Sequence, residues 1–188
     1  MEKITTDIPR IVAALHEGKT LLYPTDTIYG IGCDATNEQA IERVFQIKNR
    51  PKHKSLLVLM ADLEMLQQYV DIHDTIANLI TNFSEPTTVI YNHPRKLAKN
   101  ALNADNTIAI RIPKHPFCQN LLHVFGKPII STSANVSGAE NPTSFDTIAN
   151  SIIEQVDIIA DKEFDTSTYK HPSKLIKINP DFSIQYLR

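Results

Sequence analysis

Residues 48–54 concentrate four permanent cations and one histidine, in the order Lys-Asn-Arg-Pro-Lys-His-Lys. The whole chain carries 19 Lys and Arg residues against 21 Asp and Glu residues, for a formal net charge of −2. Because the protein as a whole is nearly neutral, this concentration predicts a specific anion site. If the backbone is extended after residue 47, Lys48 and Arg50 point the same way, and an ammonium beside a guanidinium fork suits phosphate. The alternative is that these cations only complement the dipole of a helix that ends there.

A second group of polar side chains follows an apolar run near residue 130. Ser131, Ser133, Asn135 and Ser137 alternate along the chain, so a short extended segment would place them on one side at the end of a strand. Ligands bind at such sheet edges in α/β proteins, and hydroxyl or backbone N–H groups can hold phosphate, ribose or carboxylate. The alternative is an Asx or Ser turn that caps the next element.

Small hydroxyl residues also follow a predicted strand at residues 20–23, in the run Pro-Thr-Asp-Thr. The glycines that come next, Gly30 and Gly32, lack the third glycine of a GxGxxG motif and the Lys-Ser/Thr ending of a P-loop. The sequence therefore argues against a Rossmann site and against a P-loop site.

Individual charged residues carry weaker signals. Asp26 and Asp34 lie eight residues apart in a predicted loop, a poor metal-binding pattern, and we assign no metal site. Arg111 stands between two isoleucines of a predicted strand, so it must face solvent, a partner or an anion.

Apolar periodicity and capping residues predict alternating helices and strands. Asp7 and Gly18 suit the ends of a first helix, residues 36–39 have the spacing of a capping box, and Pro116 and Gly126 suit the ends of a later helix. We expect helices at residues 7–18, 36–47, 62–69, 74–83, 116–126 and 145–153, and strands at 20–23, 55–60, 87–91, 107–112, 129–132, 157–160, 174–178 and 184–187. Residues 24–34, 92–106 and 161–172 are expected to be loops.

Length and composition favour a single domain over residues 1–188, since 188 residues with 42% hydrophobic side chains can bury one sizeable core. The alternation predicts an α/β fold, and a hairpin-like C-terminal pair of strands favours a mixed sheet. Cys33 and Cys118 form no CxxC pair, which disfavours structural zinc and a disulfide framework. Neither a signal peptide nor a membrane-spanning run is present, so we expect a soluble, cytoplasmic protein with no membrane partner.

Four blocks, taken in order, are more specific than any one of them. They are the run of residues 23–32, Lys48-Asn49-Arg50-Pro51, the run of residues 107–113, and the run of residues 131–138. In this order they strongly resemble the YrdC/Sua5 family, whose signature is KxR followed much later by SxN. The resemblance covers nearly the whole chain.

The resemblance implies a twisted α/β sheet flanked by helices, with a concave, positively lined cleft. It also implies L-threonylcarbamoyladenylate synthase, a nucleotidyltransferase that converts L-threonine, bicarbonate and ATP to threonylcarbamoyl-AMP and pyrophosphate. The product serves the threonylcarbamoyladenosine modification at position 37 of tRNA. The implied partners are these substrates, the proteins of the downstream transferase complex and tRNA, if the chain contacts tRNA directly.

By motif match, the resemblance implies most of two sets of contact residues. We add Lys54 as a nucleotide-side accessory, Asn135 for holding the nucleotide or the loop around it, and Ser131. The ATP-binding set is Lys48, Arg50, Lys54, Thr107, Ser133, Asn135, Asn141 and Arg188. The threonine-binding set is Thr27, Arg111, Ser131 and Ser173. Lys48 and Arg50 are the expected catalytic pair, because cations stabilise the charge that accumulates on the phosphates. A Mg²⁺ ion is expected to accompany the nucleotide, held by phosphate oxygens and water.

The chain departs from the family pattern at three places. Residues 84–86 read Ser-Glu-Pro where relatives usually carry a PGP-like turn, which places Glu85 near the expected site. Residues 173–175 read Ser-Lys-Leu in place of a Ser-Thr-Val run, and Leu59 stands where some relatives place a histidine. These changes bear on the outer threonine contacts more than on the reaction.

Two other functions compete with the synthase. The first is a non-catalytic member of the fold, similar to YciO, that binds double-stranded RNA or tRNA; retention of Ser133 and Asn135 disfavours it. The second is a carbamoyl-transfer domain of the hydrogenase-maturation type, which is embedded in much longer chains.

Overall fold

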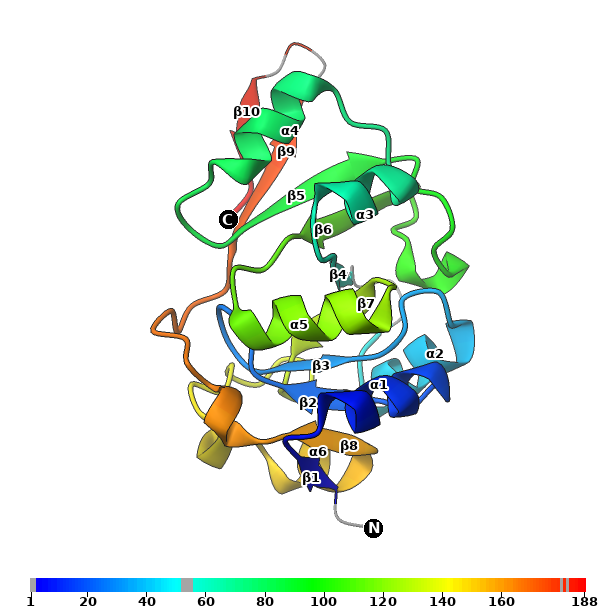
Figure 1. Cartoon of the computed structure of the whole chain (residues 1–188), viewed down its shortest axis with the longest axis vertical. Helices are drawn as coiled ribbons and strands as arrows, with labels where there is room; N and C mark the ends of the chain where they lie inside the picture. Colours follow the sequence, from blue (N-terminus) through cyan, green and yellow to red (C-terminus); the bar gives the residue numbers. More distant parts are fainter. Residues whose placement is uncertain (1–2, 52–55, 180, 182) are drawn as a thin grey trace.

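The computed structural model describes residues 3–51, 56–179, 181 and 183–188. Within these residues, ten strands form one mixed sheet in the order β1-β8-β2-β3-β7-β4-β6-β5-β9-β10 (Figure 1). The strands are β1 (Ile4–Thr5), β2 (Leu21–Tyr23), β3 (Gly30–Gly32), β4 (Leu57–Leu59), β5 (Thr87–Asn92), β6 (Thr107–Arg111), β7 (Ile129–Ser133), β8 (Ile158–Ala160), β9 (Lys174–Ile178) and β10 (Ile184–Tyr186). Parallel pairs such as β4 with β6 lie beside antiparallel pairs such as β9 with β10, which confirms the mixed sheet.

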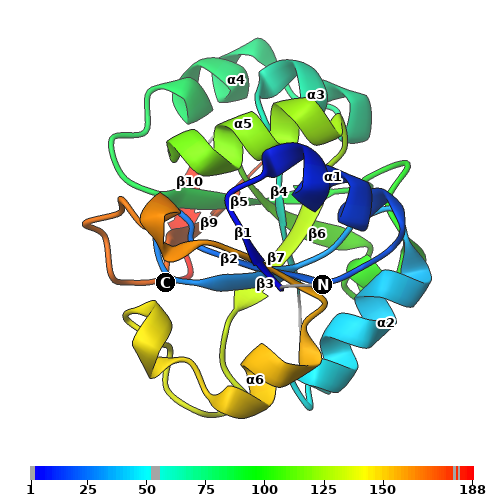
Figure 2. The same ribbon diagram turned by 60° about the horizontal axis from the view of Figure 1, so that its bottom comes forward.

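Helices cover both faces of the sheet. They are α1 (Ile8–His16), α2 (Glu38–Ile47), α3 (Leu63–Tyr69), α4 (Asp74–Thr81), α5 (Pro116–Phe125) and α6 (Asn150–Gln155), with 3₁₀ turns η1 (Lys99–Ala101), η2 (Phe145–Thr147) and η3 (Lys162–Phe164). Figure 2 shows α1, α3, α4 and α5 on one face, and α2 and α6 on the other. Helix α1 packs against α5, and α2 against α6, so the core lies on both sides of the strands.

The capping residues account for where several helices begin and end. The Asp7 carboxylate accepts a hydrogen bond from the backbone N–H of Arg10 at 3.1 Å. Asp7 is thus the N-cap of α1, which starts at Ile8, as predicted. Helix α5 begins at Pro116 and stops before Gly126, which has a left-handed φ of 70°. The cap of α2 differs from the prediction, because Asn37 accepts the first free N–H groups and the Thr36 hydroxyl donates to Asp34 instead.

Other predictions were wrong in part. Residues 30–32 are not loop but the strand β3, whose two glycines and single isoleucine give too short an apolar signal to detect. The predicted helix at 145–153 is split into η2 and α6. The segment 92–106 is not wholly solvent-exposed, because η1 packs on α2 and Ala101 is buried. The short edge strand β1 was missed, since its pairing with β8 comes from residues far away in the chain.

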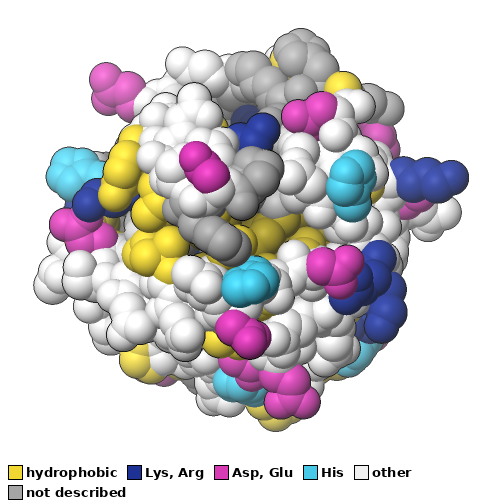
Figure 3. Space-filling model, turned by 90° about the horizontal axis from the view of Figure 1, so that it is seen from above, with side chains coloured by type: hydrophobic (Ala, Val, Ile, Leu, Met, Phe, Trp, Pro, Cys, Tyr) yellow, Lys and Arg dark blue, Asp and Glu magenta, His cyan; other side chains and the backbone are white. Residues whose placement is uncertain are grey.

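Acidic and basic side chains are interspersed on the face of the described residues that Figure 3 shows. This mixture fits the formal net charge of −2. In the described part of the chain, no helix is long and apolar enough to cross a membrane. Cys33 and Cys118 are both buried and neither forms a disulfide, as expected.

The segment between η3 and β9 is anchored to the rest of the fold beside the β2–β3 turn. Phe164 stacks on Phe117 of α5 with ring centroids 4.5 Å apart. The Ser167 hydroxyl donates to the carbonyl of Asp26 at 2.9 Å. His115 Nε2 lies 3.3 Å from the Thr166 hydroxyl, and His115 is only 2% exposed. These contacts fix the path by which the chain reaches Ser173.

Gly32 is required by a close approach of β3 to β7. A Cβ at this position would collide with the backbone carbonyl oxygen of Ile130 and would lie 2.9 Å from Cγ2 of Ile129. At Gly30, two residues earlier, the nearest atom to an added Cβ is the rotatable Ser131 hydroxyl, at 3.0 Å. The two glycines therefore differ in how readily their surroundings can adjust.

We expect Gly32→Ala to lower the free energy of unfolding by about 3 kcal/mol, at the upper end of overpacking costs, because a strand backbone must move. Gly30→Ala, the matched control in the same strand, should cost about 1 kcal/mol, since a side chain can rotate away. Urea denaturation of both variants measures the difference. Equal losses would show that β7 does not constrain Gly32.

Burial lowers the pKa of His115, although Asp26 and Asp165 oppose the shift and Lys170 adds to it. The unfolded chain therefore binds this proton more readily than the folded chain, and stability should fall as the pH drops below about 6.5. His115→Gln cannot take up this proton. In urea denaturation at pH 7.5 and at pH 5.5, the variant should lose less stability than the wild type does. The same loss in both proteins would contradict the assignment.

Candidate active site

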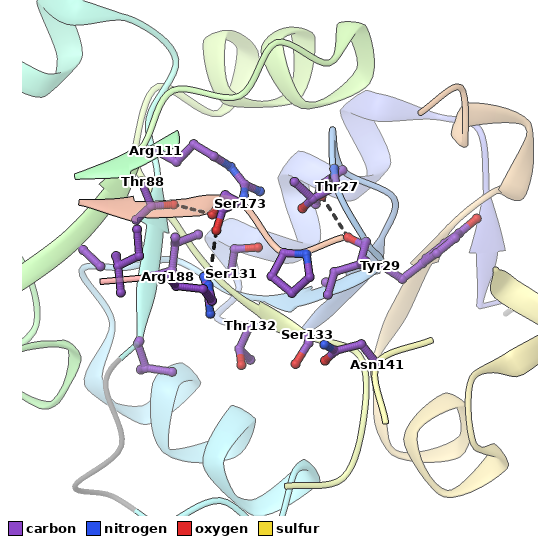
Figure 4. Close-up of a pocket in the computed structure, with 18 of the residues that line it drawn as sticks. Thr27, Tyr29, Thr88, Arg111, Ser131, Thr132, Ser133, Asn141, Ser173 and Arg188 are labelled. Carbon is purple, nitrogen blue, oxygen red and sulfur yellow. Dashed lines mark hydrogen bonds between the residues drawn. The ribbon is translucent and has the colours of Figure 1, made fainter. Parts of the chain in front are cut away.

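A cavity of about 280 Å³ opens where side chains of five adjacent strands face the same side of the sheet. The paired positions Leu57, Ala109 and Ser131 lie at its centre, on β4, β6 and β7. Thr88 of β5 and the segment that enters β9 complete one side, and the β2–β3 turn completes the other (Figure 4). The described lining is Thr25, Thr27, Ile28, Tyr29, Gly30, Arg50, Leu56, Leu57, Thr88, Ala109, Arg111, Ser131, Thr132, Ser133, Asn141, Pro172, Ser173, Leu175 and Arg188.

Most of the residues selected from the sequence meet at this cavity. Of the expected ATP set, the lining includes Arg50, Ser133, Asn141 and Arg188. It also includes the whole expected threonine set, namely Thr27, Arg111, Ser131 and Ser173. Lys54 lies outside the described residues. The structure therefore brings together side chains that are up to 161 positions apart, from Thr27 to Arg188.

The lining is cationic and rich in hydroxyl groups. Arg50, Arg111 and Arg188 contribute three guanidinium groups, and no Asp or Glu side chain belongs to the described lining. Burial lowers the pKa of Arg50, and burial together with the nearby charge of Arg111 lowers the pKa of Arg188. Arginine stays protonated despite such shifts. An anion in the cavity would therefore relieve the mutual repulsion of the cations.

Arg111 is held from behind by a buried carboxylate. Its Nη2 lies 3.1 Å from Oδ1 of Asp26, and the two residues are 5% and 7% exposed. The contact is an ion pair without hydrogen-bond geometry, and Arg111 Nε is buried with no hydrogen-bond partner among the described residues. A buried, unsatisfied donor on a cavity wall is suited to a ligand with acceptor oxygens.

Pairs of hydroxyl groups line the cavity on both sides of Arg111. Thr25 Oγ1 and Thr27 Oγ1 are 3.0 Å apart, and Thr88 Oγ1 lies 2.7 Å from Ser173 Oγ (Figure 4). Arg188 Nε donates to the Ser173 carbonyl at 3.2 Å. Such groups can donate to or accept from a polar ligand without adding charge.

Several residues that line the cavity were not predicted as contact residues. Thr25, Tyr29, Thr88 and Thr132 all line the cavity. Thr25 belongs to the hydroxyl run that the sequence singled out, so its neighbours could have indicated it. Thr88 reads as an ordinary strand residue, because only the sheet register shows which face it occupies. Thr132 alternates with Ser131 and Ser133 in β7, so a pattern read along one face omits it.

The expected common direction of Lys48 and Arg50 is wrong. The backbone is not extended there: Lys48 has φ −84° and ψ −6°, and Asn49 has a left-handed φ of 46°. This turn closes the end of α2, where the Arg50 N–H reaches the carbonyl of Phe45 at 2.9 Å. Arg50 lines the cavity, whereas Lys48 is absent from the described lining.

Lys48 instead contacts the loop that follows β7. Its ammonium donates to the carbonyl of Ser133, to the carbonyl of Asn135 at 2.6 Å and to Asn135 Oδ1 at 3.3 Å. The Ser133 hydroxyl donates to Asn135 Oδ1 at 2.5 Å, and Asn135 Nδ2 donates to the carbonyl of Ala139 at 2.5 Å. Both readings of this loop hold in part, since Ser133 lines the cavity while Asn135 builds the turn behind it.

Thr107 does not reach the described lining. It lies at the start of β6, where its hydroxyl donates to Asp105 at 2.7 Å and accepts from Asn103 at 2.8 Å. Glu85 is also absent from the described lining; it pairs with Lys174 and borders a smaller cavity. Leu59 is buried in β4 opposite Ile129. Among the described residues, no group of three or more His, Cys, Asp and Glu could hold a metal ion.

Asp26→Asn should lower the free energy of unfolding by about 3–5 kcal/mol, because it leaves the buried Arg111 cation uncompensated. Asp34→Asn is a matched control. Asp34 is also buried, and its Oδ2 lies 2.9 Å from Nζ of Lys127. The Lys127 side chain, however, is 41% exposed to water. The control should therefore lose less stability in urea denaturation. Equal losses would contradict a special requirement for charge at Asp26.

Comparison with known proteins shows the family to which the chain is similar. The Sua5/YciO/YrdC family model, described as "Telomere recombination", matches residues 13–188. A protein of Vibrio vulnificus named threonylcarbamoyl-AMP synthase is 31% identical over 160 residues, which cover 83% of this chain and 86% of the relative.

Two solved structures share the fold. P. abyssi Sua5 complexed with L-threonine superposes with a TM-score of 0.83 at 26% identity, covering 96% of this chain. This chain spans 53% of that longer protein. E. coli YciO superposes with a TM-score of 0.80 at 26% identity, covering 96% of this chain and 87% of YciO. With the family model matched over residues 13–188, the chain belongs to the Sua5/YciO/YrdC family.

Proposed function

We propose that the protein is an L-threonylcarbamoyladenylate synthase, which forms threonylcarbamoyl-AMP and pyrophosphate from L-threonine, bicarbonate and ATP. The observation that carries the proposal is the cavity itself, where three guanidinium groups and many hydroxyls converge without an acidic side chain in the described lining. A relative of 31% identity bears the name threonylcarbamoyl-AMP synthase, and the P. abyssi Sua5 structure contains L-threonine. Residues 1–188 would act as one domain.

The two sides of the cavity suit different substrates. Arg111 and the hydroxyls of Thr27, Ser131 and Ser173 would bind threonine, with the free Nε of Arg111 donating to its carboxylate. ATP would bind to the members of the expected ATP set that line the cavity, namely Arg50, Ser133, Asn141 and Arg188. Lys48 and Asn135 lie directly behind Ser133, whereas Lys54 and Thr107 remain predictions from the sequence alone.

The reaction needs no protein nucleophile. The threonine amine attacks the carbon of bicarbonate, and loss of water leaves a carbamate. A carbamate oxygen then attacks the α-phosphorus of ATP, the bond to the β-phosphate oxygen breaks, and pyrophosphate leaves. Negative charge accumulates on the phosphates during this step, so fixed guanidinium groups accelerate it by orientation and electrostatic stabilisation. This is nucleotidyl transfer.

The cavity offers hydroxyl oxygens but no described carboxylate for a Mg²⁺ ion. The ion would therefore be held mainly by the triphosphate and water, and it would neutralise phosphate charge. The product would pass to the transferase machinery that modifies tRNA, and the positively lined cavity gives tRNA a possible point of contact. A cytoplasmic location would fit these steps.

The decisive experiment measures pyrophosphate release by the unmodified protein with ATP and Mg²⁺. Release should depend on both threonine and bicarbonate. ATP turnover that is equal with and without threonine would contradict the synthase and favour a member of the fold without this activity.

Arg50→Ala should reduce threonine-dependent pyrophosphate release by about 100- to 1,000-fold, because it removes one fixed cation from the cavity. The control is Arg95→Ala, which removes a surface guanidinium paired with Asp71 at 2.6 Å and should keep near-normal activity. Circular dichroism and thermal denaturation confirm that both variants fold. Full activity of Arg50→Ala would remove Arg50 from the proposed machinery.

A further inference from the structure

Lys48 is among the largest fully buried side chains of the protein. It is 1% exposed, although it carries an ammonium group. Burying a cation is costly unless its hydrogen bonds are satisfied. The side chain must therefore be surrounded by groups that accept hydrogen bonds from the ammonium.

The acceptors described around the ammonium come from one short loop. They are the carbonyl oxygens of Ser133 and Asn135 and the Oδ1 atom of Asn135. An ammonium has three donors, so the loop offers an acceptor for each. The backbone completes the connection in the other direction, because the N–H of Ser137 donates to the Lys48 carbonyl at 2.8 Å. Lys48 thus ties the end of α2 to both ends of the segment 133–137.

This segment sets the position of one cavity wall. Ser133 lines the cavity, and its hydroxyl is directed by the same Asn135 Oδ1 that accepts from Lys48. The Asn135 side chain in turn fixes Ala139 through its Nδ2 atom. Asn141, two residues further on, also lines the cavity. A shift of the ammonium would therefore displace both Ser133 and the approach to Asn141.

We propose that Lys48 is a positioning residue, whose buried ammonium organises the loop of residues 133–139 and thereby the ATP side of the cavity. Arg50, two residues away, meets the anion directly. This inference rests on the proposed function for the identity of the ligand. The contact between Lys48 and the loop does not depend on the identity of the ligand. Hydrogen exchange of the loop amides can therefore be measured without any substrate.

The first test measures amide hydrogen exchange in the ligand-free protein. Lys48→Met keeps an unbranched side chain of nearly the same length but removes the charge and the donors, so exchange at residues 134–139 should become at least about tenfold faster. Arg95→Ala is the control, because Arg95 is a surface cation whose partners are Asp71 and the carbonyls of residues 67 and 68, and it should leave that exchange within about twofold of wild type. Unchanged loop exchange in Lys48→Met would overturn the proposal.

The second test is a double-mutant cycle on the dissociation constant for ATP, measured by calorimetry. If Lys48 acts through Asn135, Lys48→Met should weaken ATP binding little further once Asn135→Ala is present, by no more than about twofold. If Lys48 binds phosphate by itself, the two effects should multiply, and that result would overturn the positioning role. Loss of stability alone cannot produce this coupling in a folded variant.

Lys48→Gln is the second variant if Lys48→Met does not fold. The neutral amide of this variant can still donate hydrogen bonds to the loop carbonyls. The loop amides should therefore exchange faster than in the wild type but more slowly than in a variant whose residue 48 donates no hydrogen bond. Exchange identical to wild type together with lost ATP binding would show that only the charge matters, and would overturn the proposal. Wild-type protein that lacks threonine-dependent pyrophosphate release would contradict the proposed function, while the exchange data would still decide the role of Lys48 in the loop.

Discussion

The buried ammonium of Lys48 links two parts of the chain that the sequence separates by 85 positions, the end of α2 and the loop after β7. A cation this deeply buried needs oxygen acceptors around it, and the acceptors among the described residues are two backbone carbonyls and the Asn135 side-chain oxygen. Carbonyl oxygens hold the charge without neutralising it. The cation can therefore organise a loop and still contribute to the positive field around the cavity.

On the opposite side of the site, a second buried cation is stabilised by a carboxylate instead of by carbonyl oxygens. Arg111 is buried beside the Asp26 carboxylate, so its charge is compensated from behind while its Nε stays unsatisfied among the described residues. The acid itself is excluded from the described cavity lining. The result is a site in which guanidinium groups meet the ligand and the balancing charge lies one layer away, an arrangement suited to anionic substrates.

Local patterns were sufficient for most of the fold. Asp7, Pro116 and Gly126 mark helix ends through interactions within one turn, so they could be recognised without the structure. Strands β1 and β3 were missed because their pairing partners, β8 for one and β2 and β7 for the other, supply nearly all the information. The predicted helix at 145–153 failed for the reverse reason, since its apolar periodicity continued through a break between η2 and α6.

The sequence by itself determined which residue types were available for the site and in which order they occur, because the four motif blocks are local. It also determined that the fold is α/β, since hydrophobic periodicity is a property of short segments. Only the tertiary structure decided that Arg50 lines the cavity while Lys48 holds a loop, because one left-handed residue, Asn49, separates their directions. It likewise decided that Thr88 joins the site, since strand register depends on contacts distant in the chain. Thr107 lies at the far end of β6, where its hydroxyl is bound to Asn103 and Asp105.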